Sequence, residues 1–104
     1  MRLTGKVELD IFCKKYKECS YKESFQEWHD IVKKANWDKP SDVLDTFNKT
    51  DPNCRTNSNS IVCIFDRICG SRLICSIDYV IKSVRIHEVL SHDEYMEEKW
   101  KDKY

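Results

Sequence analysis

The sequence predicts an α+β fold, in which an N-terminal helical hairpin packs on a small antiparallel sheet and a short helix follows the sheet. In the first half of the chain, apolar residues recur at three- and four-residue steps, which is the period of a helix. From Ile61 onward the period changes to two and β-branched residues become frequent, which is typical of strands. A capping motif at residues 91–94 then predicts one more helix.

Two helices are expected in the first part of the chain, after a short strand at residues 1–4. The first helix covers residues 6–19, where apolar side chains fall on one face. The second begins at Ser20, because Ser20 and Glu23 match the capping box that closes a helix N-terminus. Two such helices in succession predict a helical hairpin. Its apolar stripes are Leu9, Phe12, Tyr16 and Cys19 in the first helix and Phe25, Trp28, Val32 and Ala35 in the second.

The middle of the chain is expected to hold a third, shorter helix and then the strands. Residues 36–40 break the helical pattern, and Ser41 is expected to cap the short helix. Residues 50–60 are expected to form a polar loop. Strands joined by short turns predict an antiparallel meander, with the helices covering one of its faces. These strands are expected at residues 61–68, 72–79 and 84–89.

The last helix begins at a second capping box, formed by Ser91 and Glu94. Leu90 and Tyr95 occupy the positions of a hydrophobic staple, in which the residue before the cap packs on the fourth helical residue. His92 therefore lies in the first turn of this helix. Large aromatic side chains are expected to anchor the core or an interface, and the three tryptophans are Trp28, Trp37 and Trp100.

The composition excludes several classes of protein. A chain of 104 residues suits one domain spanning residues 1–104. The longest apolar run, Ile61–Phe65, is too short to cross a bilayer, and Glu8, Asp10 and Glu18 interrupt the apolar stretch that a secretion signal needs. We therefore expect a cytoplasmic protein without membrane contact. With 18 basic and 18 acidic residues the formal net charge is zero, so a surface that binds nucleic acid must be a local patch.

Six cysteines raise the alternative of a secreted disulfide scaffold. The positions of Cys13, Cys63, Cys69 and Cys75 argue against it, because they lie within apolar periodic segments where a reduced cysteine acts as a small hydrophobic residue. The sequence also lacks the CxxC pairs that structural zinc sites usually contain. We expect reduced cysteines and no metal.

Side chains suited to RNA cleavage are concentrated in the second half of the chain. Cleavage without a metal requires a base, an acid and a cation. His92 lies at a helix N-terminus, which attracts phosphate, and Arg72 opens a strand after a turn, where its guanidinium could bind phosphate. Tyr95 could stack on a base. The alternatives are an exposed first-turn histidine, a solvated strand arginine and a tyrosine packed in the staple.

Further candidates for RNA binding lie on the same strands. Arg67 and Arg85 offer guanidinium groups, with less support from their positions than Arg72 has. His87 is flanked by Ile86 and Val89, so a half-buried structural role is the alternative for this histidine.

Several motifs, in order along the chain, resemble one known family. After the helical hairpin comes Lys-Ala-Asn-Trp-Asp-Lys-Pro-Ser-Asp-Val at residues 34–43, then Arg-Leu-Ile at 72–74, Ile-Asp-Tyr at 77–79 and Val-Leu-Ser-His-Asp-Glu-Tyr at 89–95. This order and spacing resemble the HigB toxins of the RelE superfamily across nearly the whole chain. The final Ser-His-x-Glu-Tyr motif is the most specific part of the match.

The resemblance implies both a fold and an activity. It implies a RelE-like fold and a toxin of a type II toxin–antitoxin system, an endoribonuclease that cleaves translated mRNA on the ribosome without a cofactor. A HigA-type helix-turn-helix antitoxin would neutralise the toxin, and contact with operator DNA would occur only through that antitoxin. Carried over by position, the active-site set is Arg72, His92 and Tyr95, with Arg67 and Arg85 secondary.

Two departures from the family pattern support an alternative function. In the family, a Gly-Gly-Asn turn usually precedes the strand that carries the arginine. Here Ile-Cys-Gly-Ser at residues 68–71 stands before Arg72, and the whole turn is one residue shorter than the family's. A one-residue shift in a strand would turn Arg72 to the other face of the sheet. The chain also lacks the family's basic surplus. The alternative is therefore a catalytically decayed toxin that acts only as an antitoxin- or RNA-binding module.

Overall fold

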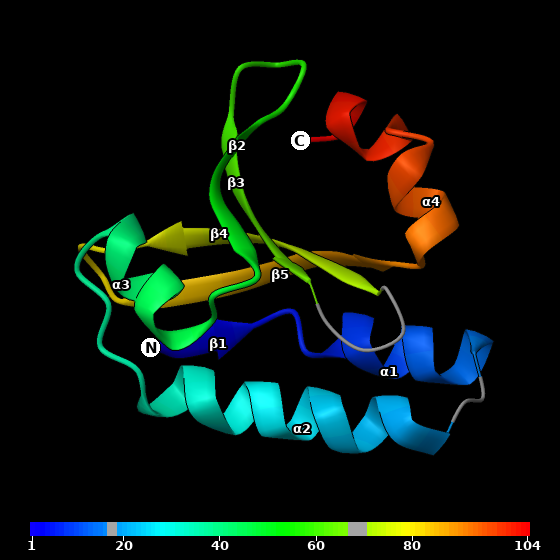
Figure 1. The fold of residues 1–104 in the computed structure, drawn as a ribbon, viewed down its shortest axis with the longest axis horizontal. Helices are drawn as coiled ribbons and strands as arrows, with labels where there is room; N and C mark the ends of the chain where they lie inside the picture. Colours follow the sequence, from blue (N-terminus) through cyan, green and yellow to red (C-terminus); the bar gives the residue numbers. More distant parts are fainter. Residues whose placement is uncertain (17–18, 67–70) are drawn as a thin grey trace.

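One five-stranded sheet forms the centre of the structure, a computed structural model that describes residues 1–16, 19–66 and 71–104. The strands stand in the order β1-β5-β4-β3-β2, and all neighbours are antiparallel except β1 and β5, which are parallel (Figure 1). The predicted meander is therefore confirmed and extended by a strand at each edge. The strands are β1 (Arg2–Thr4), β2 (Thr50–Arg55), β3 (Ile61–Asp66), β4 (Arg72–Asp78) and β5 (Ser83–Leu90).

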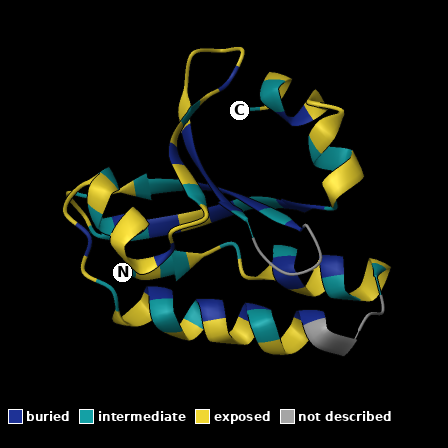
Figure 2. Cartoon of the chain, in the orientation of Figure 1, coloured by how far each residue is buried: buried dark blue, intermediate teal, exposed yellow. Residues whose placement is uncertain are grey.

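The helices lie on both sides of this sheet. The two N-terminal helices run along one face, and the C-terminal helical segments lie over the other (Figure 1). The buried sides of the two N-terminal helices face the sheet and their exposed sides face solvent (Figure 2). This arrangement confirms the predicted α+β class. The prediction that the helices cover one face of the sheet was wrong, because the C-terminal helical segments pack on the other face (Figure 1). The helices are α1 (Val7–Lys15), α2 (Cys19–Lys34), α3 (Pro40–Thr46), α4 (His92–Met96) and the 3₁₀ helix η2 (Lys99–Asp102).

Each face of the sheet has its own apolar cluster, because successive strand residues point to opposite faces. In β3, Cys63 and Phe65 belong to the larger cluster under α1 and α2, which also contains the fully buried Trp28. Val62 and Ile64 belong to a smaller cluster on the other face. Leu90 of β5 belongs to the same cluster, and Trp100 of η2 and Tyr95 of α4 pack over it. We call this side of the sheet the α4 face.

A β-bulge in β5 decides which of its side chains reach the α4 face. Glu88 pairs with Ile74 whereas Ile86 pairs with Cys75, so His87 is the extra residue. Directly opposed residues share a face, so Glu88 joins Ile74 on the α4 face while Ile86 joins Cys75 in the larger cluster.

Residues 50–60, predicted as a polar loop, begin with a strand instead, so that prediction was wrong. β2 pairs with β3 as the outer strand of the sheet, and its register shifts between Asp51 and Cys54 around Pro52. Proline and a bulge are tolerated at a sheet edge, where one side of the backbone has no partner strand. The polar residues of such a strand hide the alternation by which strands are recognised.

Three predicted helix boundaries differ from the structure. α3 begins at Pro40 with Lys39 at the cap position, and proline suits the first helical turn because it has no N–H to satisfy; Ser41 lies inside the helix. α2 already includes Cys19, so Ser20 is not its cap. α1 ends at Lys15 and Tyr16 is extended, which leaves the helical hairpin shorter than predicted.

Four cysteines, Cys13, Cys54, Cys63 and Cys75, are free thiols. Cys63 and Cys75 are buried and face each other across β3 and β4, while Cys13 and Cys54 are partly buried. Cys69 lies outside the described residues. None of the described helices is both long and apolar enough to span a bilayer.

Candidate functional site

Arg72 and Tyr95 meet on the α4 face because of the strand register. Leu90, the last residue of β5, lies directly opposite Arg72, the first residue of β4. The chain turns into α4 two residues later, and this places the Tyr95 ring beside the arginine. The Arg72 guanidinium carbon lies 5.2 Å from the centre of the Tyr95 ring, within the range of a cation–π contact.

Arg72 also forms an ion pair within the sheet. Its Nη1 lies 2.9 Å from Oδ1 of Asp66, the residue opposite it on β3. The Arg72 side chain is 16% exposed and that of Asp66 40% exposed, so the guanidinium is largely enclosed while the carboxylate remains in contact with water. The arginine therefore has a fixed orientation, and an incoming phosphate would have to compete with Asp66.

Tyr95 is packed in the smaller cluster, as the staple predicted, and it contacts the arginine as well. Its ring is stacked on Trp100 with 5.4 Å between centroids, and the Trp100 indole N–H donates a 3.0 Å hydrogen bond to the Tyr95 carbonyl. Burial raises the pKa of the Tyr95 hydroxyl, and the nearby Arg72 charge only partly opposes this shift. The hydroxyl is therefore protonated at neutral pH.

His92 is exposed at the first position of α4, one turn before Tyr95. Within the described part of the chain it has no hydrogen bond or ion pair, so its imidazole faces solvent. The predicted capping box is confirmed, since the Ser91 hydroxyl accepts from the Glu94 N–H at 3.2 Å and the Glu94 carboxylate accepts from the Ser91 N–H at 3.1 Å.

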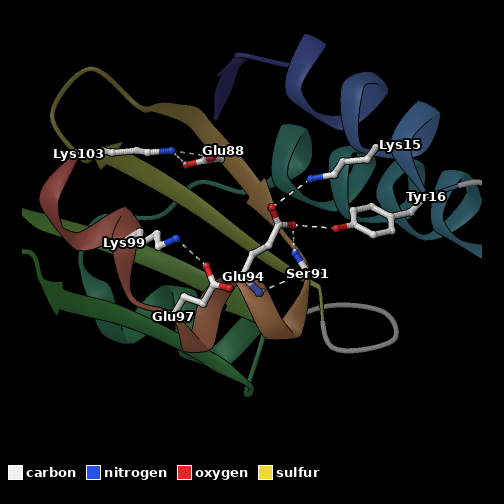
Figure 3. A network of polar contacts seen from close by, with 8 residues as sticks. All are labelled: Lys15, Tyr16, Glu88, Ser91, Glu94, Glu97, Lys99 and Lys103. Atoms are coloured by element: carbon white, nitrogen blue, oxygen red, sulfur yellow. Dashed lines mark hydrogen bonds and ion pairs between the residues drawn. The ribbon is translucent and has the colours of Figure 1, made fainter.

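Glu94 has a second role that the sequence analysis missed, because it joins α4 to the end of α1 (Figure 3). Its carboxylate accepts hydrogen bonds from the Tyr16 hydroxyl at 3.0 Å and from the Lys15 ammonium at 3.1 Å. Burial alone would raise the pKa of Glu94, but these donors and the Ser91 N–H and hydroxyl outweigh it and lower the pKa to about 2. The helix that carries His92 and Tyr95 is thereby fixed at its first turn.

Arg85 and His87 also lie on the α4 face, whereas Arg67 lies outside the described residues. Arg85 is exposed and pairs in register with Ser76. His87 is partly buried, with its Nε2 hydrogen-bonded to the Ser76 hydroxyl at 2.5 Å and its ring stacked on Tyr104 with centroids 4.8 Å apart. Burial, with a smaller effect of the Arg85 charge, lowers the pKa of His87.

The last residues of the chain also lie beside the site, although no motif in the sequence places them there. The Tyr104 hydroxyl donates to Glu88 at 2.9 Å. The Lys103 ammonium lies 3.3 Å from the same carboxylate (Figure 3). On the other side, the Lys101 carbonyl accepts from the Asn57 N–H at 2.9 Å, which attaches this segment to the β2–β3 hairpin. The segment resembles polar surface in the sequence, and only Trp100 signals that it is packed.

No three His, Cys, Asp or Glu side chains in the described ranges lie close enough to hold a metal ion together. The chemistry available on the α4 face is that of a fixed guanidinium, a phenol and imidazoles beside a partly open polar surface.

These features define a small α+β protein in which an arginine and other polar groups surround the apolar cluster on one face of the sheet. A model of the family HigB_toxin, described as the RelE-like toxic component of a toxin-antitoxin system, matches residues 21–98. The chain therefore belongs to the HigB toxin family and has the RelE-like fold that the motifs implied. No curated protein matches the chain.

Proposed function

We propose that this toxin is an endoribonuclease that cleaves mRNA during translation on the ribosome, and that the α4 face holds the RNA. The observation that carries the proposal is the contact between Arg72 and Tyr95 at 5.2 Å, next to the exposed His92. Cleavage without a metal requires a base, an acid and a cation, and a guanidinium, a phenol and a solvent-facing imidazole are groups that can supply them.

The reaction assigns a task to each of these groups. The RNA 2′-oxygen attacks the neighbouring phosphorus and loses its proton to a base, while the bond from phosphorus to the 5′-oxygen breaks and that oxygen takes a proton from an acid. We assign proton transfer to His92, whose ring is exposed at the start of α4. Arg72 neutralises the charge that accumulates on the phosphate oxygens. Tyr95 orients Arg72 and offers a protonated hydroxyl, and Arg85, His87 and Arg67 contact flanking RNA.

The partner of the toxin is an antitoxin, because the family is the toxic component of a toxin-antitoxin system. We propose that it is a HigA-type protein with a helix-turn-helix domain. The toxin would then reach operator DNA only through this antitoxin. Its own formal net charge of zero gives it no general affinity for DNA.

A second candidate function is supported by the Arg72–Asp66 ion pair. The Asp66 carboxylate lies 2.9 Å from the Arg72 guanidinium and already neutralises the charge that would bind a phosphate. A decayed toxin that binds its antitoxin or RNA without cutting would retain this pair.

Primer extension on a translated message separates the two candidates. Wild-type protein is expected to give cuts in register with codons when ribosomes are translating and none on the free message. Arg72→Ala should lower the cleavage rate by about 10²–10³-fold, the effect of removing one donor to a developing negative charge. His92→Ala should lower it by about 10²-fold or more, as the loss of a proton-transfer group does.

Arg55→Ala is the matched control, because Arg55 is an exposed arginine on the opposite edge of the sheet from β1. It should cleave at the wild-type rate, and thermal melting should show that all variants are folded. A folded wild-type protein that binds its antitoxin but gives no codon-linked cuts would overturn the nuclease proposal and favour the binding module.

A further inference from the structure

A hollow of about 610 Å³ opens beside the α4 face, where β1 ends and α1 begins. Its walls come from the end of β1, the start of α1, the middle of β5 and Tyr104. Arg85, His87 and Tyr104 supply most of its chemistry, and Glu8 contributes a carboxylate. An arginine, two rings and one acceptor around a hollow of this size suit a single nucleotide.

Arg85 is the cation of this hollow. It is exposed, and no acidic side chain among the described residues forms an ion pair with it. Arg72, by contrast, forms an ion pair with Asp66. An unneutralised guanidinium at the rim of a hollow favours a phosphate group.

The two rings form a stacking platform whose orientation is fixed from both sides. The His87 and Tyr104 rings are stacked at 4.8 Å with 29° between their planes. The Ser76 hydroxyl is hydrogen-bonded to Nε2 of His87, and the Tyr104 hydroxyl donates a hydrogen bond to the Glu88 carboxylate. Because burial lowers the pKa of His87, its ring is neutral at pH 7 and serves for stacking rather than as a charge. Bases of any sequence stack on such aromatic surfaces.

Glu8 gives the hollow an acceptor beside this platform. Glu8 and Tyr104 line the same hollow. A carboxylate repels phosphate, but it accepts hydrogen bonds from the amino and imino groups on base edges. The hollow is therefore suited to a base near Glu8 and a phosphate near Arg85.

The hollow is too far from Arg72 to hold the phosphate that is cleaved. Arg85 and Leu90 are five residues apart on β5, and Leu90 is the residue opposite Arg72. At about 3.3 Å per strand residue this is a separation of roughly 16 Å. Both positions lie on the α4 face, so the hollow would take a nucleotide other than the one whose phosphate is cleaved.

We propose that the hollow is a binding subsite for a nucleotide of single-stranded RNA that flanks the cleaved bond, with Arg85 on its phosphate and the Tyr104–His87 pair beneath its base. This inference rests on the proposed function, because it takes the α4 face as the surface that holds RNA. It adds a subsite in which affinity, rather than bond cleavage, is the role of the residues.

The test measures binding without cleavage by fluorescence anisotropy with the full chain. Its probe is a fluorescent 2′-O-methyl hexaribonucleotide, which cannot be cut because its methylated 2′-oxygens cannot attack the phosphorus. Arg85→Ala should weaken binding about tenfold and reduce the slope of log affinity against log salt by about 1. Tyr104→Ala should weaken binding about tenfold with an unchanged salt slope. Tyr104→Phe keeps the ring and should bind within about twofold of wild type.

Arg55→Ala again serves as the control and should bind like wild type. Thermal melting identifies a variant that has lost its fold, and Tyr104→Phe separates loss of the ring from loss of its hydrogen bond to Glu88. The subsite proposal is overturned if folded Arg85→Ala and Tyr104→Ala bind the hexanucleotide as tightly as wild type. It is also overturned if wild type does not bind the hexanucleotide at millimolar concentration.

The outcome is separate from that of the nuclease test. If wild-type protein cuts translated mRNA while both subsite variants bind RNA normally, the nuclease proposal stands and the subsite fails. If the protein never cuts but these variants lose RNA binding as expected, the subsite stands and the nuclease proposal fails.

Discussion

The carboxylate of Glu94 accepts a hydrogen bond from the Tyr16 hydroxyl at 3.0 Å, and this contact joins the first turn of α4 to the residue that follows α1. The two residues are 78 positions apart in the chain. Lys15 reinforces the contact, and the Ser91 cap holds the same carboxylate from within α4. The candidate site therefore depends on the position that this carboxylate gives to α4.

We predict that this contact makes stability depend on pH under acidic conditions. The ordinary pKa of Glu94 is 4.5 and its folded pKa is about 2, so its stabilising effect is complete above pH 5 and is lost as the pH falls toward 2. Because the side chain is 35% exposed, we discount for solvent screening and expect a loss of about 1 kcal/mol. Urea unfolding of wild type and Glu94→Gln at pH 6 and at pH 3 measures this loss. The difference in unfolding free energy between the two proteins should be smaller at pH 3 than at pH 6.

Glu97→Gln is the control for this pH prediction, since Glu97 is exposed and contacts only Lys99, at 3.5 Å, among the ion pairs of the described residues. Its unfolding free energy should track that of wild type at both pH values. A gap for Glu94→Gln that is the same at pH 6 and pH 3 would contradict the role assigned to the ionised carboxylate.

The elements predicted from sequence were those with a strong local pattern. The strands from Ile61 onward alternate clearly, and the Ser91–Glu94 cap is a local motif, so both were found. β2 was missed because an outer strand with Pro52 and a bulge is stabilised by its neighbour rather than by its own pattern. The parallel pairing of β1 with β5 was not predicted for the same reason: it joins residues about 80 positions apart, with no local signal.

Gly5→Ala should strongly destabilise the protein. Gly5 adopts a φ of +82°, and a Cβ at this position would lie 2.2 Å from the Ile86 carbonyl oxygen. Backbone strain and this collision together should cost about 3 kcal/mol of unfolding free energy. Chemical denaturation of Gly5→Ala and of its exposed neighbour Lys6→Ala provides the measurement, and Lys6→Ala should stay within about 0.5 kcal/mol of wild type. Equal stability of both variants would show that β1 can move away from β5.

Alkylation should distinguish the buried thiols from the partly buried ones. Burial raises the pKa of Cys63 and of Cys75, so the reactive thiolate is scarce as well as inaccessible. With iodoacetamide at pH 8, peptide mass spectrometry should find Cys13 and Cys54 modified in the folded protein. Cys63 and Cys75 should be modified only after unfolding in urea, which serves as the control for their intrinsic reactivity. Modification of Cys75 at the rate of Cys13 in the folded state would contradict the core described above.

The candidate site was predictable only in part from the sequence. Arg72 and Tyr95 were named from motifs, and the register of β4 with β5 brings them together. The ion pair with Asp66 was not foreseen, since it depends on which residue of β3 lies opposite Arg72. Tyr104 was missed because residues 99–104 carry no strand or helix periodicity, and only folding places this ring on His87.

Trp100 is expected to be the residue that holds this last segment against the sheet. It is 2% exposed, stacks on Tyr95 and donates a hydrogen bond to the Tyr95 carbonyl. Trp100→Ala should cost about 3–5 kcal/mol, as is usual for removal of a buried tryptophan. Trp100→Phe keeps most of the burial and loses the hydrogen bond, so about 1 kcal/mol of the cost should come from that bond and the rest from the smaller ring.

The consequence for function follows from the contacts of Tyr95. If Trp100 fixes the Tyr95 ring and thereby Arg72, Trp100→Phe should lower the rate of mRNA cleavage more than it weakens RNA binding, because Arg85 and Tyr104 remain in place. Met96→Ala, at a position 62% exposed on the same helix, should change neither stability by more than about 0.5 kcal/mol nor cleavage. Urea unfolding and primer extension on the same preparations provide both readouts. Normal cleavage by Trp100→Phe would show that the orientation of Arg72 does not depend on a fixed Tyr95 ring, and Tyr95 would then be a packing residue rather than part of the site.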